Sequence, residues 1–416
     1  MMDIGLEDRN ENQSDTTTIK LHKGEPDKTM IPFDLLEKAT QKVFADEKGR
    51  HQRTYWTYGE DEGNTELRHQ VINFLRHTCA IATLSYENIF ITNGTSAILD
   101  QICTMFLRAG DTILVECPTY SYGLQIFRDH HLHIISYSVD DDGLVIDSTF
   151  INDVLERTKP KMVYIVPTFQ NPAGITMSHH RREQLVQLSL KYHFLIVADE
   201  VYHHLDYEKQ DHNSNGIDHD RLVEHPKSFA AYHAAGTVIA LHSFSKILTP
   251  ALRLGFACAS HEHVNAMGRY GLIHSGGGAN PFVSGIVART LEDGSLKKFI
   301  DEKLCVEYGK RMTVLYNELM QIFGEKHITC RRPSGGYFLW VKFNDTGVDC
   351  DQLLIIARKY GVTFHPGRLF AHDEEAKAKL AHCLRLCFAI VDCEQLLAGC
   401  ARLKQAFEEY KNITLQ

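Results

Sequence analysis

Short runs of apolar, often β-branched residues alternate with segments of helical periodicity between about residues 60 and 305. The clearest runs cover residues 89–92, 112–115, 162–166, 194–197 and 238–241. Each run is nearly all apolar and is bounded by Gly, Pro or Asp, as expected of strands that are buried on both faces. The pattern therefore predicts an α/β fold with a mostly parallel central sheet that is flanked by helices.

Beyond about residue 310 the rhythm changes. A helical segment precedes an apolar strand at 336–341, a helix that begins at Cys350, a strand at 383–388 and a terminal helix. This order predicts a second, smaller α+β domain, which agrees with the chain length of 416 residues. The polar stretch 208–237 interrupts the larger domain and predicts a long functional or mobile loop. We expect a disordered tail at 1–18, an N-terminal segment at 19–60 that contributes to the small domain, a large domain at 61–305 and a small C-terminal domain at 306–416.

Charge and composition exclude several classes of function. A formal net charge of −9 argues against a nucleic-acid partner, which requires a basic surface. No apolar run approaches a membrane span, and the polar N-terminus lacks targeting features, so we expect a cytoplasmic protein with reduced cysteines. The 24 histidines show no metal-ligand spacing. We therefore predict no metal site and expect pairs such as His203-His204 at the surface or at helix ends.

The candidate chemistry centres on Lys246, which follows the run at 238–241 and two hydroxyl residues, Ser243 and Ser245. Most lysines near a strand end are solvated, so the residue alone is a weak signal. Partial desolvation and a neighbouring cation such as Arg253 would lower the pKa of the amine, as imine chemistry requires. Arg253 and the serine hydroxyls also supply hydrogen-bond donors for a phosphate.

Polar residues follow two other predicted strands. Asp199 comes just after the run at 194–197, Tyr202 stands three residues later, and Asn171 lies beyond the run at 162–166. Open α/β sheets bind ligands outside the carboxyl ends of their strands, which is where these side chains are expected. Each also has an ordinary alternative, a helix N-cap for Asp199 and a turn for Asn171.

A phosphate-binding turn is predicted at Gly94-Thr95-Ser96, which follows the run at 89–92 and opens a helix. Backbone N–H groups at a helix N-terminus, together with two hydroxyls, suit a dianion. The alternative is an ordinary capped helix after a turn.

Together these motifs resemble those of the fold-type I aminotransferases of the aspartate aminotransferase superfamily, which use pyridoxal phosphate. The resemblance extends from about Lys20 to the C-terminus, with the motifs in the family's order and approximate spacing. Its specific parts are Ser243-Phe244-Ser245-Lys246 with Arg253 seven residues later, Asp199-Glu200-Val201-Tyr202, and Asn171-Pro172-x-Gly174. The resemblance implies the pyridoxal-phosphate-dependent transferase fold and the same cofactor.

The resemblance also implies a role for each candidate. Lys246 forms the Schiff base with pyridoxal phosphate and later moves the proton, and Asp199 pairs with the pyridine nitrogen. Asn171 and Tyr202 donate to the phenolic oxygen of the ring, Asn171 also lies near the substrate, and Tyr120 stacks on the ring. The expected phosphate ligands are Gly94, Thr95, Ser96, Ser243, Ser245 and Arg253.

Further residues match substrate and subunit positions of the family. Arg385 matches the arginine that binds the substrate α-carboxylate through a bidentate fork, and Gly24 matches the N-terminal glycine near the substrate. Tyr58 matches the tyrosine that contacts the phosphate in the partner subunit, and Ser275 is expected to face the neighbouring active site. The resemblance thus implies a homodimer with shared active sites, in which the segment 19–60 contributes to the interface.

Two stretches narrow the resemblance. Residues 333–340 and 166–174 are similar to the subgroup that includes 2-aminoadipate, kynurenine and aromatic aminotransferases. The implied reaction transfers an amino group from an L-amino acid to a 2-oxo acid such as 2-oxoglutarate by a ping-pong mechanism. A β-lyase or an aminocyclopropane-carboxylate-type eliminase shares the cofactor residues and stays an alternative. A pyridoxal-phosphate-sensing regulatory module is a third, but it calls for a basic winged-helix domain where only about 20 residues precede the matched region.

Overall fold

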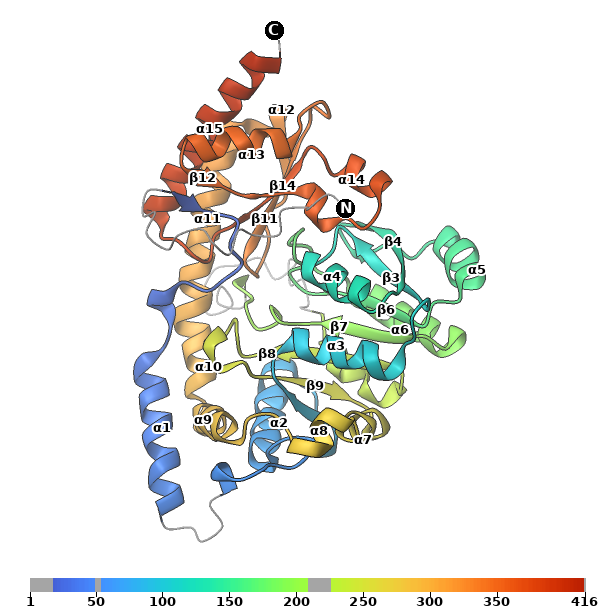
Figure 1. Ribbon diagram of the computed structural model, residues 1–416. Helices are drawn as coiled ribbons and strands as arrows, with labels where there is room; N and C mark the ends of the chain where they lie inside the picture. Colours follow the sequence, from blue (N-terminus) through green and yellow to red (C-terminus); the bar gives the residue numbers. More distant parts are fainter. Residues whose placement is uncertain (1–17, 49–53, 209–225, 415–416) are drawn as a thin grey trace, which may run out of the picture.

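A computed structural model describes residues 18–48, 54–208 and 226–414. Within these residues a sheet of eight strands forms the centre of the molecule, with helices packed around it (Figure 1). In spatial order its strands are β2 (Ile89–Thr92), β9 (Gly255–Ala259), β8 (Val238–Ser243), β7 (Leu195–Asp199), β6 (Met162–Ile165), β3 (Thr112–Cys117), β4 (His133–Asp140) and β5 (Gly143–Leu144).

The central strands run parallel. Neighbours from β8 through β7, β6 and β3 to β4 are all parallel, whereas β9 is antiparallel to β8 and β2, and β5 is antiparallel to β4. All five predicted runs are strands of this sheet, so the prediction of a mostly parallel α/β fold is confirmed. Because β6, β7 and β8 are parallel, the residues that follow them emerge at one edge of the sheet.

Two longer strands of the sheet did not stand out in the sequence. The sequence of β9, Gly-Phe-Ala-Cys-Ala, contains no β-branched residue, although the strand is fully buried. Most residues of β4 are at least partly exposed, so this strand lacks a continuous apolar run. Their positions in the sheet could therefore not be read from local apolar patterns.

Helices of the large unit begin where polar side chains cap them. Asn64 accepts the backbone N–H of Leu67 at the start of α2, and Ser178 accepts that of Arg181 at the start of α6. The helices are α2 (Thr65–Cys79), α3 (Thr95–Phe106), α4 (Ser121–Asp129), α5 (Glu156–Thr158), α6 (His179–Tyr192), α7 (His261–Gly268), α8 (Gly271–Gly276), α9 (Pro281–Glu292) and α10 (Ser295–Phe299).

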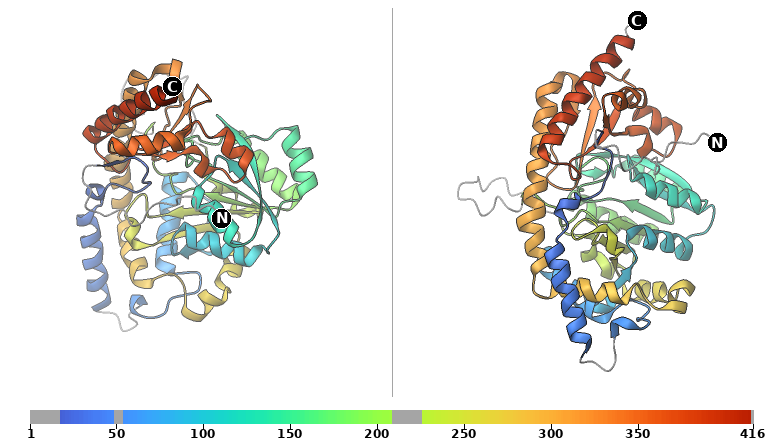
Figure 2. Two further views of the ribbon diagram at one scale, coloured as in Figure 1. Left: turned by 45° about the horizontal axis from the view of Figure 1, so that its top comes forward. Right: turned by 60° about the vertical axis from the view of Figure 1, so that its left-hand side comes forward.

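The C-terminal part contains a smaller mixed unit. Among its described residues, β10 (Ile328–Cys330), β11 (Phe338–Phe343), β14 (Cys383–Cys387) and β13 (His365–Pro366) form an antiparallel sheet in that order. Its helices are α11 (Val306–Ile322), α12 (Gly324–His327), α13 (Cys350–Lys359), α14 (Glu374–Lys379) and α15 (Cys393–Thr414). Helix α11 is long and runs down the side of the molecule from the smaller sheet toward α9 (Figure 2).

The N-terminal segment contacts both parts of the molecule. Strand β1 (Ile19–Lys20) pairs in parallel with β12 (Val362–Thr363), next to the smaller sheet. Helix α1 (Phe33–Lys48) packs along α9 and is drawn in blue at the lower left of Figure 1. This path brings Gly24, between β1 and α1, to the space between the two units.

Several predictions met a different outcome in the structure. The predicted loop at 208–237 contains a 3₁₀ helix at Phe229–Ala235, while residues 209–225 lie outside the described residues. Residues 1–17 of the tail predicted at 1–18 also lie outside them. The surface placement of His203 was wrong, because only 1% of it is exposed. It packs beside Glu200, another buried polar residue. The predicted strand at 336–341 begins at Phe338, since Gly336 has a positive φ of 78°.

The described residues also bear on cysteine, membrane and metal chemistry. All eleven cysteines lie among them as free thiols, seven of them buried. Within the described part of the chain, no helix has the length and apolar character needed to cross a bilayer. In the same residues no group of three or more His, Cys, Asp or Glu side chains is placed to hold a metal ion.

Candidate active site

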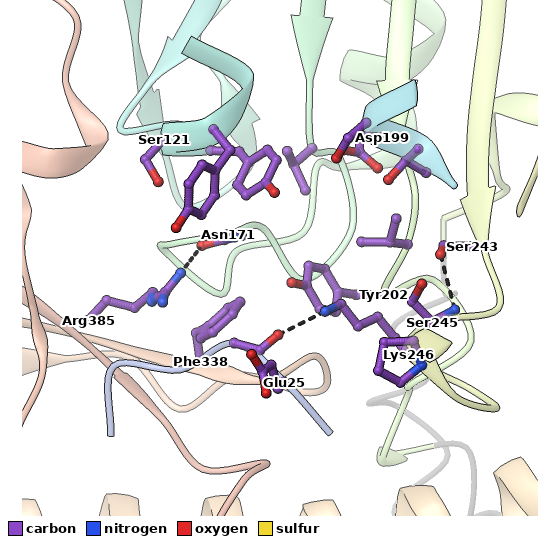
Figure 3. A pocket seen from close by; sticks show the side chains of 18 of the residues that line it. Glu25, Ser121, Asn171, Asp199, Tyr202, Ser243, Ser245, Lys246, Phe338 and Arg385 are labelled. Atoms are coloured by element: carbon purple, nitrogen blue, oxygen red, sulfur yellow. Dashed lines mark hydrogen bonds between the residues drawn. The ribbon is translucent and has the colours of Figure 1, made fainter. Parts of the chain in front are cut away.

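A cavity of about 240 Å³ opens at the carboxyl ends of β6, β7 and β8, where the large sheet faces the smaller one (Figure 3). The predicted site residues that line it are Gly24, Thr95, Ser96, Tyr120, Asn171, Asp199, Tyr202, Ser243, Ser245, Lys246, Arg253 and Arg385. Segments that are far apart in the sequence therefore converge as the motifs predicted.

Lys246 projects into the cavity just beyond β8. Its Nζ donates a hydrogen bond to the carbonyl oxygen of Gly24 at 2.8 Å, and its own carbonyl oxygen accepts one from Tyr337 at 3.0 Å. Burial lowers the pKa of the Lys246 amine below its ordinary value, and the nearby Arg385 lowers it further. A lysine with a lowered pKa has a larger neutral fraction, which is the form that acts as a nucleophile or base.

Asp199 lies at the end of β7, and only one of its two carboxylate oxygens accepts a hydrogen bond. Oδ2 accepts the Tyr164 hydroxyl at 2.9 Å, while Oδ1 is buried and has no hydrogen-bond partner among the described residues. Burial raises the pKa of Asp199 to about 6. A buried, unpaired carboxylate oxygen is unfavourable, so a cationic N–H donor from a bound group fits this position. A protonated pyridine nitrogen is such a donor.

The opposite end of the cavity suits a phosphate. Gly94 precedes α3 with a φ of 90°, and a Cβ atom added there would lie 2.9 Å from Arg253 Nη2. A side chain at this position would therefore disturb the guanidinium. The N-terminus of α3, the Arg253 cation and the nearby hydroxyls of Thr95, Ser96, Ser243 and Ser245 together fit a phosphate dianion.

Arg385 enters from β14 on the smaller sheet and is 5% exposed. Its Nη1 donates to Asn171 Oδ1 at 2.7 Å, and its Nη2 donates to the His22 carbonyl oxygen at 2.6 Å. The guanidinium also lies 4.1 Å from the ring centre of Phe338 and 5.0 Å from that of Phe370. These contacts hold a buried cation at the cavity wall, where a carboxylate can meet it.

Two tyrosines complete the predicted cavity wall. Tyr202 is 4% exposed, and burial raises the pKa of its hydroxyl well above the ordinary value, so the group stays a hydrogen-bond donor. Its ring packs 5.7 Å from that of Phe338. Tyr120 lines the cavity just before α4 and contacts the ring of Tyr122 at 5.8 Å.

Two predicted residues lie away from this cavity, and a third, Gly94, adjoins the wall residue Thr95 without lining the cavity itself. Tyr58 is 87% exposed, and Ser275 is also exposed at the end of α8. Neither belongs to the cavity wall that the described residues of this chain form. Their expected roles concern a partner subunit.

Sequence reasoning missed several residues of the site. Tyr164 binds Asp199 but lies within an apolar run, where it reads as a core residue. Phe338 flanks Arg385 and was noted only as part of a subgroup motif. The remaining wall residues outside the prediction are Glu25, Ser121, Tyr122, Val166, Val201, Pro250 and His365. A glutamate or histidine in a loop carries no local signal that it faces a cavity.

Comparisons with known proteins agree with this geometry. The family model for aminotransferase class I and II matches residues 16–403. An aromatic-amino-acid aminotransferase of Thermococcus litoralis is 30% identical over 94% of this chain and 88% of its own. A 2-aminoadipate transaminase of Thermus thermophilus is 28% identical over 77% of this chain and 76% of its own.

A solved structure extends the agreement to the fold. The kynurenine aminotransferase of Pyrococcus horikoshii superposes with a TM-score of 0.81 at 29% identity, covering 95% of this chain and 92% of that one. The names of these relatives are those of transaminases, which favours amino-group transfer over elimination. The chain belongs to the class I and II aminotransferases, and it is a pyridoxal-phosphate enzyme that transfers amino groups between amino acids and 2-oxo acids.

Proposed function

We propose that the amino donor is an aromatic L-amino acid and that the acceptor is a 2-oxo acid, in a ping-pong reaction. The observation that carries the site assignment is the convergence of Lys246, the unpaired Asp199 Oδ1 and the Arg385 guanidinium on one cavity. These three groups match the amine, the ring-nitrogen partner and the carboxylate anchor that the reaction requires.

Lys246 is the residue that moves the proton in this proposal. The cofactor, when bound, supplies a carbonyl carbon that bonds to amino groups and a ring that accepts the electron pair left by the α-proton. Lys246 Nζ would hold the cofactor in the resting enzyme. Once released from the cofactor, the Lys246 amine would take the substrate's α-proton and carry it to the cofactor side. Its lowered pKa favours the neutral form that accepts a proton.

The other polar residues tune and hold the ring. Asp199 Oδ1 would accept the N–H of the ring nitrogen and keep that nitrogen protonated. Asn171 and Tyr202 would donate to the ring's phenolic oxygen, and Tyr120 would pack against the ring. The phosphate would be held by Gly94, Thr95, Ser96, Ser243, Ser245 and Arg253.

The substrate α-carboxylate binds Arg385. The guanidinium presents a planar fork that matches a carboxylate, and Asn171 and Phe338 fix its orientation. Gly24 allows the Phe338 ring to pack close to the backbone at the cavity wall, because a Cβ there would approach that ring to 3.0 Å. Binding the carboxylate at this point places the α-carbon between Arg385 and Lys246.

The aromatic donor class is supported by the cavity-wall residues that have no role in binding the cofactor or the α-carboxylate. Once Lys246, Arg253 and Arg385 are assigned, the wall residues that the structure describes include no further lysine or arginine. The distal carboxylate of 2-aminoadipate would therefore lack a fixed cation among them. The rings of Tyr122 and Phe338, by contrast, suit a flat apolar side chain.

The exposed apolar side chains near the N-terminus support a homodimer. Tyr58 is 87% exposed, Phe33 68%, Trp56 48% and Phe44 46%. Large apolar patches on a surface mark interaction sites. We infer that this surface meets a second copy of the chain, to whose phosphate site Tyr58 contributes and whose active site Ser275 faces. The eleven free cysteines are in keeping with a reducing compartment such as the cytoplasm.

A spectral half-reaction screen tests the proposed donor. The purified enzyme is mixed with single amino acids without acceptor, and conversion of the cofactor's absorbance is followed. Phenylalanine, tyrosine and kynurenine should convert the cofactor at least tenfold more efficiently than 2-aminoadipate. Preferential conversion by 2-aminoadipate would refute the donor class, and formation of pyruvate and ammonia without that conversion would favour a lyase. Borohydride reduction followed by peptide mapping should place the cofactor on Lys246.

A further inference from the structure

A buried arginine outside the cavity binds segments that form the cavity wall. Arg182 lies on α6, and its side chain is 0% exposed. A guanidinium has five N–H groups, and each of them has an acceptor here. The acceptors are the carbonyl oxygens of Pro167, Met177 and Lys227 at 2.7, 2.9 and 3.3 Å, the Thr168 hydroxyl at 2.9 Å and Glu200 Oε1 at 3.2 Å.

The first of these segments is the loop that carries Asn171. A hydrogen bond of 2.8 Å from the Met177 backbone N–H to the Pro167 carbonyl oxygen closes the base of this loop. Arg182 Nη2 binds the Pro167 carbonyl and Nε binds the Met177 carbonyl. The Arg182 side chain therefore binds both ends of this loop, and Asn171, in the middle of the loop, lines the cavity.

The second segment is the end of β7. Glu200 follows Asp199 directly, and its carboxylate accepts both Arg182 Nη1 and the backbone N–H of Phe229, the latter at 3.0 Å. The Ser228 hydroxyl donates to the other side of the same carboxylate. Glu200 is thus held in one orientation by groups from α6 and from the N-terminus of the 3₁₀ helix.

Two buried histidines also lie near Glu200, but Arg182 remains the positively charged partner of its carboxylate. His242 Nε2 lies 3.6 Å and His203 Nδ1 lies 3.8 Å from the carboxylate oxygens. Burial lowers the pKa of His242, which favours its neutral form. Arginine stays charged throughout the working pH range, so Arg182 is the constant counter-ion of Glu200.

Stability alone is a weak explanation for such a pair. Removing two charges from water costs free energy that their attraction offsets only in part, and well-packed apolar residues often replace buried ion pairs without loss. A rigid fork with every donor engaged instead fixes the relative positions of its acceptors. Here those acceptors lie beside two residues of the cofactor site.

We propose that Arg182, with Glu200 as its counter-ion, is a positioning residue that sets Asn171 and Asp199 at the correct separation around the cofactor ring. Asn171 would donate to the ring oxygen and Asp199 would accept from the ring nitrogen. Because both atoms belong to one rigid ring, the two side chains must be held at a fixed separation. The inference rests on the roles of Asn171 and Asp199 in the proposed function. A misplacement of about 1 Å in such a site reduces rates by as much as about a hundredfold.

The first test uses Arg182→Lys, which keeps the positive charge but replaces the five-donor fork with a single ammonium. A pH titration of the bound cofactor's absorbance reports on the hydrogen bonds to its ring. The midpoint should shift in the same direction as in Asn171→Ala, and kcat should fall about ten- to a hundredfold with the cofactor still bound. The matched control is Arg181→Lys, the next residue of α6, which instead binds Asp140 at 2.5 Å and the Gly143 carbonyl oxygen.

Thr168→Val is a milder second variant that guards against misfolding. It removes only one acceptor of Arg182 at a fully buried position and nearly preserves the side-chain volume. Its midpoint should move in the same direction as that of Arg182→Lys, but less. A lowered urea midpoint with an unchanged spectral midpoint in both variants would mean that Arg182 only stabilises the fold, and would overturn the proposal.

A double-mutant cycle separates positioning through Asn171 from an independent effect. If Arg182 acts in part through Asn171, Arg182→Lys should shift the spectral midpoint less in the Asn171→Ala background than in the wild type. A fully additive shift would contradict positioning through Asn171. If instead the proposed roles of Asn171 and Asp199 were wrong, Asn171→Ala and Asp199→Asn would leave the midpoint of the absorbance titration unchanged. If those two shift it while Arg182→Lys matches Arg181→Lys, only the positioning role is wrong.

Discussion

Glu116 provides a prediction about how stability depends on pH. It lies in β3, is 1% exposed, and accepts the Val166 backbone N–H at 2.8 Å. Burial raises the pKa of Glu116 from the ordinary 4.5 to about 8. Between these values the folded protein keeps a proton on this side chain that the unfolded chain releases. The free energy of unfolding must therefore fall as the pH rises through this window.

The magnitude follows from the width of the window. Each pH unit in which the two states differ by one proton changes the free energy of unfolding by about 1.4 kcal/mol. Over the whole window Glu116 thus destabilises the folded state by up to about 5 kcal/mol. Glu116→Gln keeps the acceptor oxygen for Val166 and cannot ionise. The variant should therefore gain stability relative to the wild type by several kcal/mol as the pH rises from about 5 to 8.

Urea unfolding of both apoproteins across this pH range measures the difference directly. Other titrating groups are common to both proteins and cancel. The exposed Glu325→Gln serves as the matched control and should show no such trend. A difference between wild type and Glu116→Gln that stays constant from pH 5 to pH 8 would refute the reasoning, because Glu116 would then carry the same charge in both states.

Three further predictions address the site and the subunit arrangement. Lys246→Ala should retain cofactor but lose at least about 10²-fold in turnover, with partial rescue by added methylamine; single-turnover absorbance measures both. Arg385→Lys should raise the KM for amino acids at least tenfold and leave cofactor affinity unchanged, since an ammonium cannot form the bidentate fork; an unaltered KM would contradict the carboxylate role. Mixing inactive Tyr58→Ala and Lys246→Ala subunits should restore about a quarter of wild-type activity, because half the dimers would be hybrids with one intact site. No recovery would mean that Tyr58 does not act across subunits.

The cavity residues that the sequence predicted best belong to contiguous motifs at strand ends. Asp199 and Lys246 each follow a buried apolar run, and parallel strands bring such positions to one edge. The runs themselves were recognisable because both faces of the sheet are covered. A local pattern thus fixed where these side chains emerge, without any knowledge of the contacts they make.

Contacts between segments far apart in the sequence could not be predicted from such local patterns. Tyr164, which binds Asp199, sits in an apolar run and gives no sign of its hydrogen bond. The carbonyl oxygen of Gly24 accepts from Lys246 across 222 positions of the chain. Arg182 looks like any charged residue of an amphipathic helix until the fold surrounds it. Such roles depend on tertiary packing, which local periodicity does not carry.

One such contact set links the two sheets at the site. Tyr337 donates its hydroxyl to the carbonyl oxygen of Lys246, and the next residue, Phe338, places its ring against the guanidinium of Arg385. Successive residues of an extended chain point to opposite sides. The start of β11 therefore contacts the lysine on one side and the carboxylate-binding arginine on the other. Any displacement of this strand changes both contacts together, so the positions of the proton-transfer group and the substrate anchor are mechanically coupled.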